Sequence, residues 1–251
     1  MNRDTVNVFF LWLVLTALGE FVILGTDLFS YPIVGAEEGH VVDDAFFFLT
    51  ALAVPVAAFV LSMLGYAFIR FRVSGPDEDG PPVKMHRSWA IFWLLWTTGL
   101  TLFVIVHPGI TGILEIRHLG SGEPDLVVET EGSRWYWTIN YPDGVTVKTF
   151  EEDAEMVLPV DSHVKFEVTS TDVLHAFWVP AFRMKVDAVP GLVTTISATT
   201  IGLGNYRDDP QYRLQCAELC GLLHNGMDVP VRVVSVAEFD AWLAEKAVTA
   251  A

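Results

Sequence analysis

Cysteine and basic residues are both scarce in this chain of 251 residues. It has two cysteines, and its 15 lysines and arginines stand against 31 acidic residues, which gives a formal net charge of −16. Two cysteines cannot build a disulfide framework. The deficit of basic residues argues against a nucleic-acid partner, because phosphate groups are bound by basic surfaces. The chain also lacks an internal repeat and a low-complexity tract.

Charge of either sign is sparse, at 18% of residues, whereas 52% are hydrophobic. This balance disfavours both a disordered chain and a wholly water-soluble one. The apolar residues gather in three stretches, 6–24, 45–69 and 89–106, and the last two contain no charged residue. Because about 20 apolar residues cross the hydrocarbon core of a bilayer, the last two stretches predict membrane spans.

The first stretch allows two interpretations. Residues 1–30 carry Arg3 before an apolar run, as a secretory signal peptide does. However, the run is long for a signal, Glu20 interrupts it, and no clear small-residue cleavage site follows. These features favour an additional, uncleaved span, so the chain has three transmembrane helices in this interpretation and two if the segment is a signal peptide.

The distribution of basic residues predicts the orientation of these spans. Residues 31–107 form the predicted transmembrane hairpin, and 30–44 carry no lysine or arginine. The loop at about 70–87 carries four basic residues, Arg70, Arg72, Lys84 and Arg87. Basic loops stay on the cytoplasmic side. We therefore predict a multi-pass protein of the plasma membrane with residues 108–251 on the extracytoplasmic side.

The external part, 108–251, reads as a β-rich domain. Short alternating or β-branched stretches lie at 135–140, 145–150, 163–169, 193–201 and 229–236, and turn residues separate them. This spacing predicts an antiparallel β-sandwich or barrel. Residues 236–247 have apolar side chains at helical spacing and predict one C-terminal helix.

Both cysteines lie in one short loop together with other soft ligands. Cys216 and Cys220 are followed closely by His224 and Met227. Thiolate and thioether sulfur select copper, whereas zinc would use the cysteines and the histidine but has little use for the methionine. His175, between two predicted strands, is the candidate for a second imidazole ligand. The metal-free alternative for the two cysteines is an external disulfide.

The sequence resembles subunit II of the haem-copper cytochrome c oxidases over about residues 45–243. The resemblance consists of the two-span hairpin, the run Trp135-Tyr136-Trp137, the segments 170–175 and 185–191, and the cysteine loop. It implies a membrane-anchored all-β protein in which a cupredoxin-like antiparallel β-sandwich follows the transmembrane helices. Residues 1–30 are extra to the usual family pattern. Residues 85–89 contain no carboxylate, which argues against a role of this subunit in proton entry.

The resemblance also implies a site with two copper ions, the binuclear CuA centre. Its ligands would be His175, Cys216, the backbone oxygen of Glu218, Cys220, His224 and Met227. The carboxylate of Glu218 would face a magnesium ion shared with the catalytic subunit. Trp135 would be the point of electron entry. Asp172 and Asp187 match acids near the surface that faces the electron donor.

The implied function is electron transfer within a respiratory terminal oxidase. A cytochrome c or a small blue copper protein would donate electrons, which pass to haem in subunit I for oxygen reduction and proton pumping, and subunit III would be a further partner. The alternatives are the CuA subunit of a nitric-oxide reductase, a copper-free quinol oxidase subunit II, and a metal-free adhesion or sensor domain. Retention of every ligand side chain argues against the copper-free forms.

The acidic residues are scattered rather than concentrated on one segment. After residue 107 there are 21 acidic and 10 basic residues, a net charge of −11. An acidic surface can steer a basic donor. The scattered pattern also fits the solvation of a protein from a halophile, where salt would screen most long-range steering.

Overall fold

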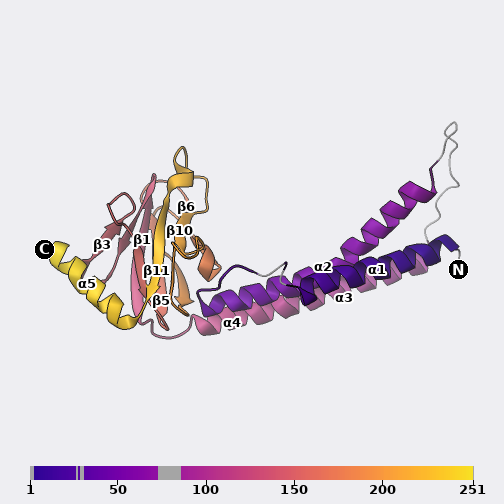
Figure 1. Cartoon of the computed structure of the whole chain (residues 1–251), viewed down its shortest axis with the longest axis horizontal. Helices are drawn as coiled ribbons and strands as arrows, with labels where there is room; N and C mark the ends of the chain where they lie inside the picture. The colour runs from indigo at the N-terminus through magenta and orange to yellow at the C-terminus, as the bar shows by residue number, and fades with distance from the viewer. Residues whose placement is uncertain (1–2, 27, 29–30, 73–85, 251) are drawn as a thin grey trace. The chain divides into compact units, whose positions relative to one another are not determined.

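The computed structural model describes residues 3–26, 28, 31–72 and 86–250, which fall into two compact units. The first unit comprises Met1–Tyr31 and Asp44–Gly112, and the second comprises Pro32–Asp43 and Ile113–Ala251. Figure 1 draws the whole chain. Most of the predicted cytoplasmic loop, 73–85, lies outside the described residues.

Long apolar helices make up the first unit. Their bounds are α1 (Arg3–Gly25), α2 (Glu37–Arg70) and α3 (Arg87–Val104), and α3 continues through η2 (Ile105–Ile110) into α4 (Thr111–Leu119). The start of α2, up to Asp43, and most of α4, from Ile113, belong to the second unit. In the described part of the chain, Arg3–Gly25, Glu37–Arg70 and Arg87–Leu119 are long and apolar enough to cross a membrane. The three stretches seen in the sequence are therefore helical.

Pro108 does not end the third helical stretch. A proline usually terminates a helix because it lacks an N–H group and restricts the residue before it. Here His107 leaves helical geometry, with φ of −134° and ψ of 121°, and the helix resumes at Thr111. The result is a kink, which has the ordinary cause of a proline within the helix.

Individual side-chain contacts join the helices of the first unit. The indole N–H of Trp12 in α1 donates to the backbone oxygen of Pro55 in α2 at 2.8 Å. The rings of Phe48 in α2 and Phe103 in α3 lie 6.0 Å apart between centroids. The beginning of α2 and the end of α3 are therefore neighbours, as a transmembrane hairpin requires.

Two sheets form the sandwich of the second unit (Figure 1). The first sheet has the order β3 (Thr146–Lys148), β2 (Tyr136–Asn140), β1 (Leu126–Ser133), β5 (His163–Ser170) and β8 (Thr194–Thr199). The second has the order β4 (Met156–Pro159), β11 (Asp228–Val234), β10 (Arg213–Cys216), β6 (His175–Val179) and β7 (Met184–Ala188), and β9 (Gly204–Asn205) pairs with β11.

The predicted all-β sandwich after N-terminal helices is confirmed, but its sheets are mixed rather than purely antiparallel. β1 pairs with β5 in parallel, and β4 pairs with β11 in parallel, whereas the other pairs are antiparallel. Each parallel pair joins strands that are not consecutive in the chain. Side-chain alternation along a single strand does not report such long-range partners.

Alternating side chains fill the space between the sheets. In β5, every second residue is buried, and β2 follows the same alternation. The largest buried side chains include those of Trp137, Phe166 and Phe177. The C-terminal helix α5 (Val236–Ala250) confirms the predicted helix and places Trp242 against Tyr141, with ring centroids 5.0 Å apart.

The segment Pro32–Asp43, here called the strap, belongs to the β-rich unit although it precedes α3 by more than forty residues. Gly35 donates its N–H to the backbone oxygen of Ala181 at 2.8 Å and accepts from the N–H of Ile201 at 3.0 Å. Ala36 is fully buried in the core and forms a β-bridge with Thr200. The strap thus adds both hydrogen bonds and apolar contact to the sandwich.

Charged side chains fasten the strap at its two ends. Arg183 donates through Nε and Nη2 to the carboxylate of Asp43, at 2.7 and 3.1 Å. Its guanidinium also donates to the backbone oxygens of Pro180 at 2.8 Å and Pro32 at 2.7 Å. Arg183 and Asp43 are each only 14% exposed, so water screens this ion pair weakly.

Candidate metal centre

The strand order brings four connections to one end of the sandwich. Gly132 of β1 lies opposite Ser170 of β5, and because that pair is parallel, both strands end there. In the second sheet, His175 begins β6 beside Ala188 at the end of β7, and Cys216 at the end of β10 lies opposite Phe177. The connections that follow these strand ends therefore carry the predicted site residues.

Two buried thiols lie at the centre of this end. The sulfur atoms of Cys216 and Cys220 are 3.8 Å apart, and both side chains are buried. Nδ1 of His175 lies 3.8 Å from the Cys216 sulfur. The donor atoms of these three residues all fall within 4.8 Å of one another, which is close enough to share metal ions.

The remaining predicted donors approach the same two sulfur atoms. Nδ1 of His224 is 3.5 Å from the Cys220 sulfur, and the thioether sulfur of Met227 is 4.0 Å from it. The backbone oxygen of Glu218 lies 3.2 Å from the Cys216 sulfur. All six atoms predicted as ligands therefore converge, and each histidine approaches a different cysteine.

The chemistry of this donor set fits copper. Thiolate and thioether sulfur with imidazole nitrogen suit copper better than the oxygen ligands that magnesium and calcium prefer. A single tetrahedral zinc ion would need only four of the six atoms. The two sulfur atoms lie 3.8 Å apart, and each has an imidazole nitrogen of its own within 3.8 Å.

Burial and the neighbouring thiol of Cys216 raise the pKa of Cys220 to about 12. At neutral pH, the metal-free Cys220 therefore holds its proton. Metals bind the thiolate, so ion binding must displace that proton. Burial keeps the Cys220 thiol away from solvent.

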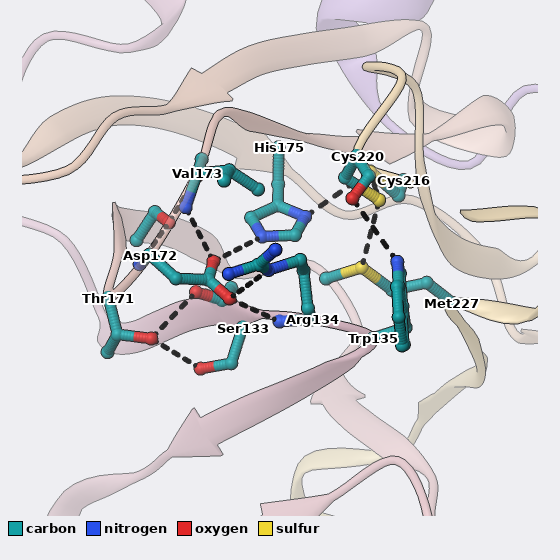
Figure 2. Close-up of polar contacts among 12 residues, drawn as sticks. Ser133, Arg134, Trp135, Thr171, Asp172, Val173, His175, Cys216, Cys220 and Met227 are labelled. Atoms are coloured by element: carbon teal, nitrogen blue, oxygen red, sulfur yellow. Dashed lines mark hydrogen bonds and ion pairs between the residues drawn. The ribbon is translucent and has the colours of Figure 1, made fainter. Parts of the chain in front are cut away.

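A network of hydrogen bonds holds the imidazole of His175 (Figure 2). Oδ1 of Asp172 lies 3.0 Å from Nε2 of His175, and Oδ2 accepts from the backbone N–H of Arg134 at 2.9 Å and from its Nε at 3.1 Å. Val173 donates its N–H to Oδ1 at 2.6 Å. Partial burial opposes ionisation of Asp172, but the bonds from His175 and Arg134 outweigh it and hold the pKa of that carboxyl well below its usual range.

The indole of Trp135 touches the backbone of the cysteine loop. Its Nε1 donates to the backbone oxygen of Cys220 at 3.2 Å. Gly221 has a φ of +122°, and a Cβ there would lie 3.2 Å from the indole ring. Only glycine therefore suits both the backbone conformation and the close approach of Trp135. Trp135 is half-buried rather than fully exposed.

Three supporting residues were not predicted to contact the site from the sequence, and of these only Trp137 was named there, as part of the aromatic run. A Cβ on Gly132 would lie 3.0 Å from the His175 ring, so glycine leaves room for the imidazole. Trp137 donates its indole N–H to the backbone oxygen of Met227 at 3.3 Å. Arg134 reaches Asp172 across 38 positions of sequence. The position of Asp172, three residues before His175, was the one local signal of this network.

Two predicted acidic side chains lie outside the cluster of donor atoms. The side chain of Glu218 is exposed, and the contact to Cys216 is made by its backbone oxygen. Asp187 is exposed in β7, beside Ala176 of β6. Neither carboxylate joins the cluster of His175, Cys216 and Cys220 that the described residues form.

The chain is similar to known proteins in both sequence and structure. Residues 144–235 match the family described as cytochrome c oxidase subunit II, periplasmic domain. The crystal structure of the periplasmic domain of subunit II of cytochrome oxidase from Bradyrhizobium japonicum is 33% identical and covers 50% of this chain and 95% of its own, with a TM-score of 0.45.

Two relatives match most of the chain. The probable cytochrome c oxidase subunit 2 of Rickettsia felis is 29% identical over 221 residues, which cover 81% of this chain and 67% of the relative. The cytochrome c oxidase subunit 2 of Brettanomyces custersianus is 31% identical over 217 residues, which cover 76% of this chain and 85% of the relative. The chain therefore belongs to the cytochrome c oxidase subunit II family, a component of an oxidoreductase complex.

Proposed function

We propose that this subunit holds a binuclear copper centre and accepts electrons for a respiratory haem-copper oxidase. The observation that carries the proposal is the convergence of two imidazole nitrogens, a thioether sulfur and a backbone oxygen on two thiols 3.8 Å apart. Copper bound there would supply one-electron storage shared between two ions. No open coordination position is needed for a substrate, which suits a relay rather than a catalytic site.

The protein side chains prepare this site in several ways. Cys216 and Cys220 would bridge the ions as thiolates, while His175 and His224 would each bind one ion. Met227, whose side chain is only 1% exposed, would add a weak thioether ligand from the buried side of the loop. Because the ligands come from β6, β10 and the loop before β11, a stable sandwich fixes their spacing and limits rearrangement during electron transfer.

Trp135 is the proposed entry point for electrons. It is half-buried, and its indole N–H bonds to the backbone of Cys220, a proposed ligand. This contact joins the domain surface to the copper site through one hydrogen bond and a few covalent bonds. Asp187, exposed at the same end of the domain, is proposed to face the donor.

The proposed partners follow from the family and from the helices. Subunit I would receive the electrons at its haem, subunit III would complete the core complex, and a cytochrome c or blue copper protein would donate. The exposed Glu218 carboxylate is proposed to share a magnesium ion with subunit I. The charge bias of the loops supports a plasma-membrane location, with residues 108–251 outside and the helical segments anchoring the chain.

Copper loading of the full chain in detergent tests the proposed function. We expect about two copper ions per chain, a purple colour and a mixed-valence electron paramagnetic resonance signal delocalised over both ions. The same chain from cells that express the whole complex is expected to copurify with a haem-bearing subunit. One copper ion with a blue-type spectrum, or none, would overturn the binuclear site. Copurification with nitric-oxide reductase activity would favour that alternative enzyme.

Replacing Trp135 with phenylalanine is expected to slow electron entry while copper binding persists. The change removes the N–H that bonds to the Cys220 backbone and part of the aromatic contact with the loop. We expect reduction by a soluble cytochrome c to be about tenfold slower, equivalent to ~1.4 kcal/mol of activation free energy. Stopped-flow absorbance of the copper band measures the rate. Trp242→Phe on α5 is the matched control, and equal rates in the two variants would contradict the role of Trp135.

A further inference from the structure

We propose that Asp172 is a positioning residue that selects the protonation form of His175 and links it to the connection that carries Trp135. The inference rests on the proposed function in one respect, that His175 is a copper ligand. Everything else in it follows from contacts of the described residues. Figure 2 shows the two oxygens of the Asp172 carboxylate directed to different partners, His175 on one side and Arg134 on the other.

The two nitrogens of the His175 ring have different neighbours. Both oxygens of the Asp172 carboxylate accept from N–H groups of Val173 and Arg134, so the carboxylate acts as an acceptor. At 3.0 Å from Oδ1 of Asp172, Nε2 of His175 must therefore carry the proton. Nδ1 is then left with its lone pair, and it is the nitrogen directed at the Cys216 sulfur. The carboxylate thus presents the ring in the form that a metal ion can bind.

Packing fixes the orientation of the His175 ring plane, but it does not determine which ring nitrogen carries the proton. The imidazole is fully buried between Gly132, where a Cβ would lie 3.0 Å away, and Trp137, whose ring centroid is 6.0 Å distant. Apolar neighbours and a ring edge do not distinguish a protonated nitrogen from an unprotonated one. The contact with the Asp172 carboxylate, unlike this packing, discriminates between the two tautomers.

Hydrogen bonds also fix the position of the Asp172 carboxylate itself. Asp172 accepts four hydrogen bonds, two on Oδ1 from His175 and Val173 and two on Oδ2 from the backbone and side chain of Arg134. Two further bonds join the same connections, from Thr171 N–H to the Gly132 oxygen at 3.0 Å and between the Ser133 and Thr171 hydroxyls at 2.7 Å. The Trp135 connection is therefore tied to the His175 connection at three successive residues.

Asparagine at position 172 separates this role from simple shape. Its amide keeps the size of the carboxylate but offers one accepting oxygen and one donating nitrogen. If the amide oxygen accepts from His175, the amide nitrogen faces the N–H donors of Arg134. If the oxygen accepts from Arg134 instead, the nitrogen faces Nε2 of His175 and favours the tautomer that is protonated on Nδ1. Either arrangement leaves one donor set unpaired. Glu129→Gln is the matched control, since it removes one exposed carboxylate charge from β1 without touching the site.

Two measurements on the full chain test the proposal. Nitrogen-15 chemical shifts of the metal-free protein report the tautomer of His175, and we expect Nε2 protonated in the wild type and in Glu129→Gln but a mixture in Asp172→Asn. Competition with a copper chelator is expected to show an affinity about 10–100-fold lower in Asp172→Asn. Thermal unfolding of the metal-free chains identifies any variant that fails to fold.

The outcomes separate this inference from the proposed function. If the wild type fails to bind two copper ions, the proposed function is wrong, while the tautomer measurement still tests the role of Asp172. If the wild type binds copper and folded Asp172→Asn matches Glu129→Gln in both tautomer and affinity, the positioning role is wrong and the copper function stands. A changed unfolding temperature without a change in tautomer or affinity would assign Asp172 a purely structural role and would also overturn the proposal.

Discussion

Replacing Cys220 with serine is expected to abolish the proposed binuclear copper centre and with it the proposed electron transfer through this subunit. The Cys220 sulfur lies within 4.0 Å of three other donor atoms, the sulfur atoms of Cys216 and Met227 and Nδ1 of His224. A serine hydroxyl is a hard, weakly acidic ligand that does not replace a bridging thiolate at neutral pH. We expect copper content to fall from about two ions to at most about one, with the mixed-valence signal absent.

A matched substitution at Met227 makes this expectation specific. Met227→Leu keeps the volume of a buried side chain but removes the thioether. Because a thioether is a weak ligand that tunes the potential, we expect Met227→Leu to retain two copper ions and to shift the reduction potential. Metal analysis and electron paramagnetic resonance of both folded variants provide the comparison. A full mixed-valence signal in Cys220→Ser would show that Cys220 does not bridge the ions.

Removing the guanidinium of Arg183 is expected to lower the free energy of unfolding of the β-rich unit by about 2–4 kcal/mol. Arg183→Ala leaves the carboxylate of Asp43 without its partner in a site where both are only 14% exposed. It also removes the guanidinium donors to the backbone oxygens of Pro180 and Pro32, of which Pro180 keeps the bond from the backbone N–H of residue 183. The strap should therefore detach before the sandwich unfolds.

Hydrogen exchange of the full chain in detergent measures this effect locally. In Arg183→Ala, we expect faster exchange at the N–H groups of Gly35 and Ile201, which bond between the strap and the sandwich. Lys185→Ala is the control, because Lys185 is exposed two residues away and its loss should change stability by less than about 0.5 kcal/mol. Equal protection of the strap in both variants would contradict the importance of the Arg183 contacts.

The sequence alone was sufficient for features that depend on local pattern. Uninterrupted apolar runs predicted the helices, and alternation predicted strands such as β5, because the pattern of burial repeats within a few residues. β1 was missed because Glu129, Glu131 and Gly132 lie in it, although its inward residues do alternate. The parallel pairing of β1 with β5 depends on residues that are 38 positions apart.

The residues of the candidate site could likewise be predicted where they are close in the sequence, but not where they are far apart. Cys216, Cys220, His224 and Met227 are close in the sequence, so their chemistry was visible as a motif. The contact of Arg134 with Asp172 was not visible, because it exists only after two connections from different strands meet. The strap was missed for a similar reason: it joins a short segment to the start of α2 at Glu37, and Arg183 contacts Asp43 across 140 positions.

The strap makes the β-rich unit discontinuous, with the hairpin of α2 and α3 inserted between its two parts. Closing a loop of such length costs entropy that grows with the logarithm of its length. The hairpin removes much of that cost, since Phe48 near the start of α2 already lies beside Phe103 near the end of α3. The contact between α2 and α3 thus lowers the entropic cost of bringing the two parts of the β-rich unit together.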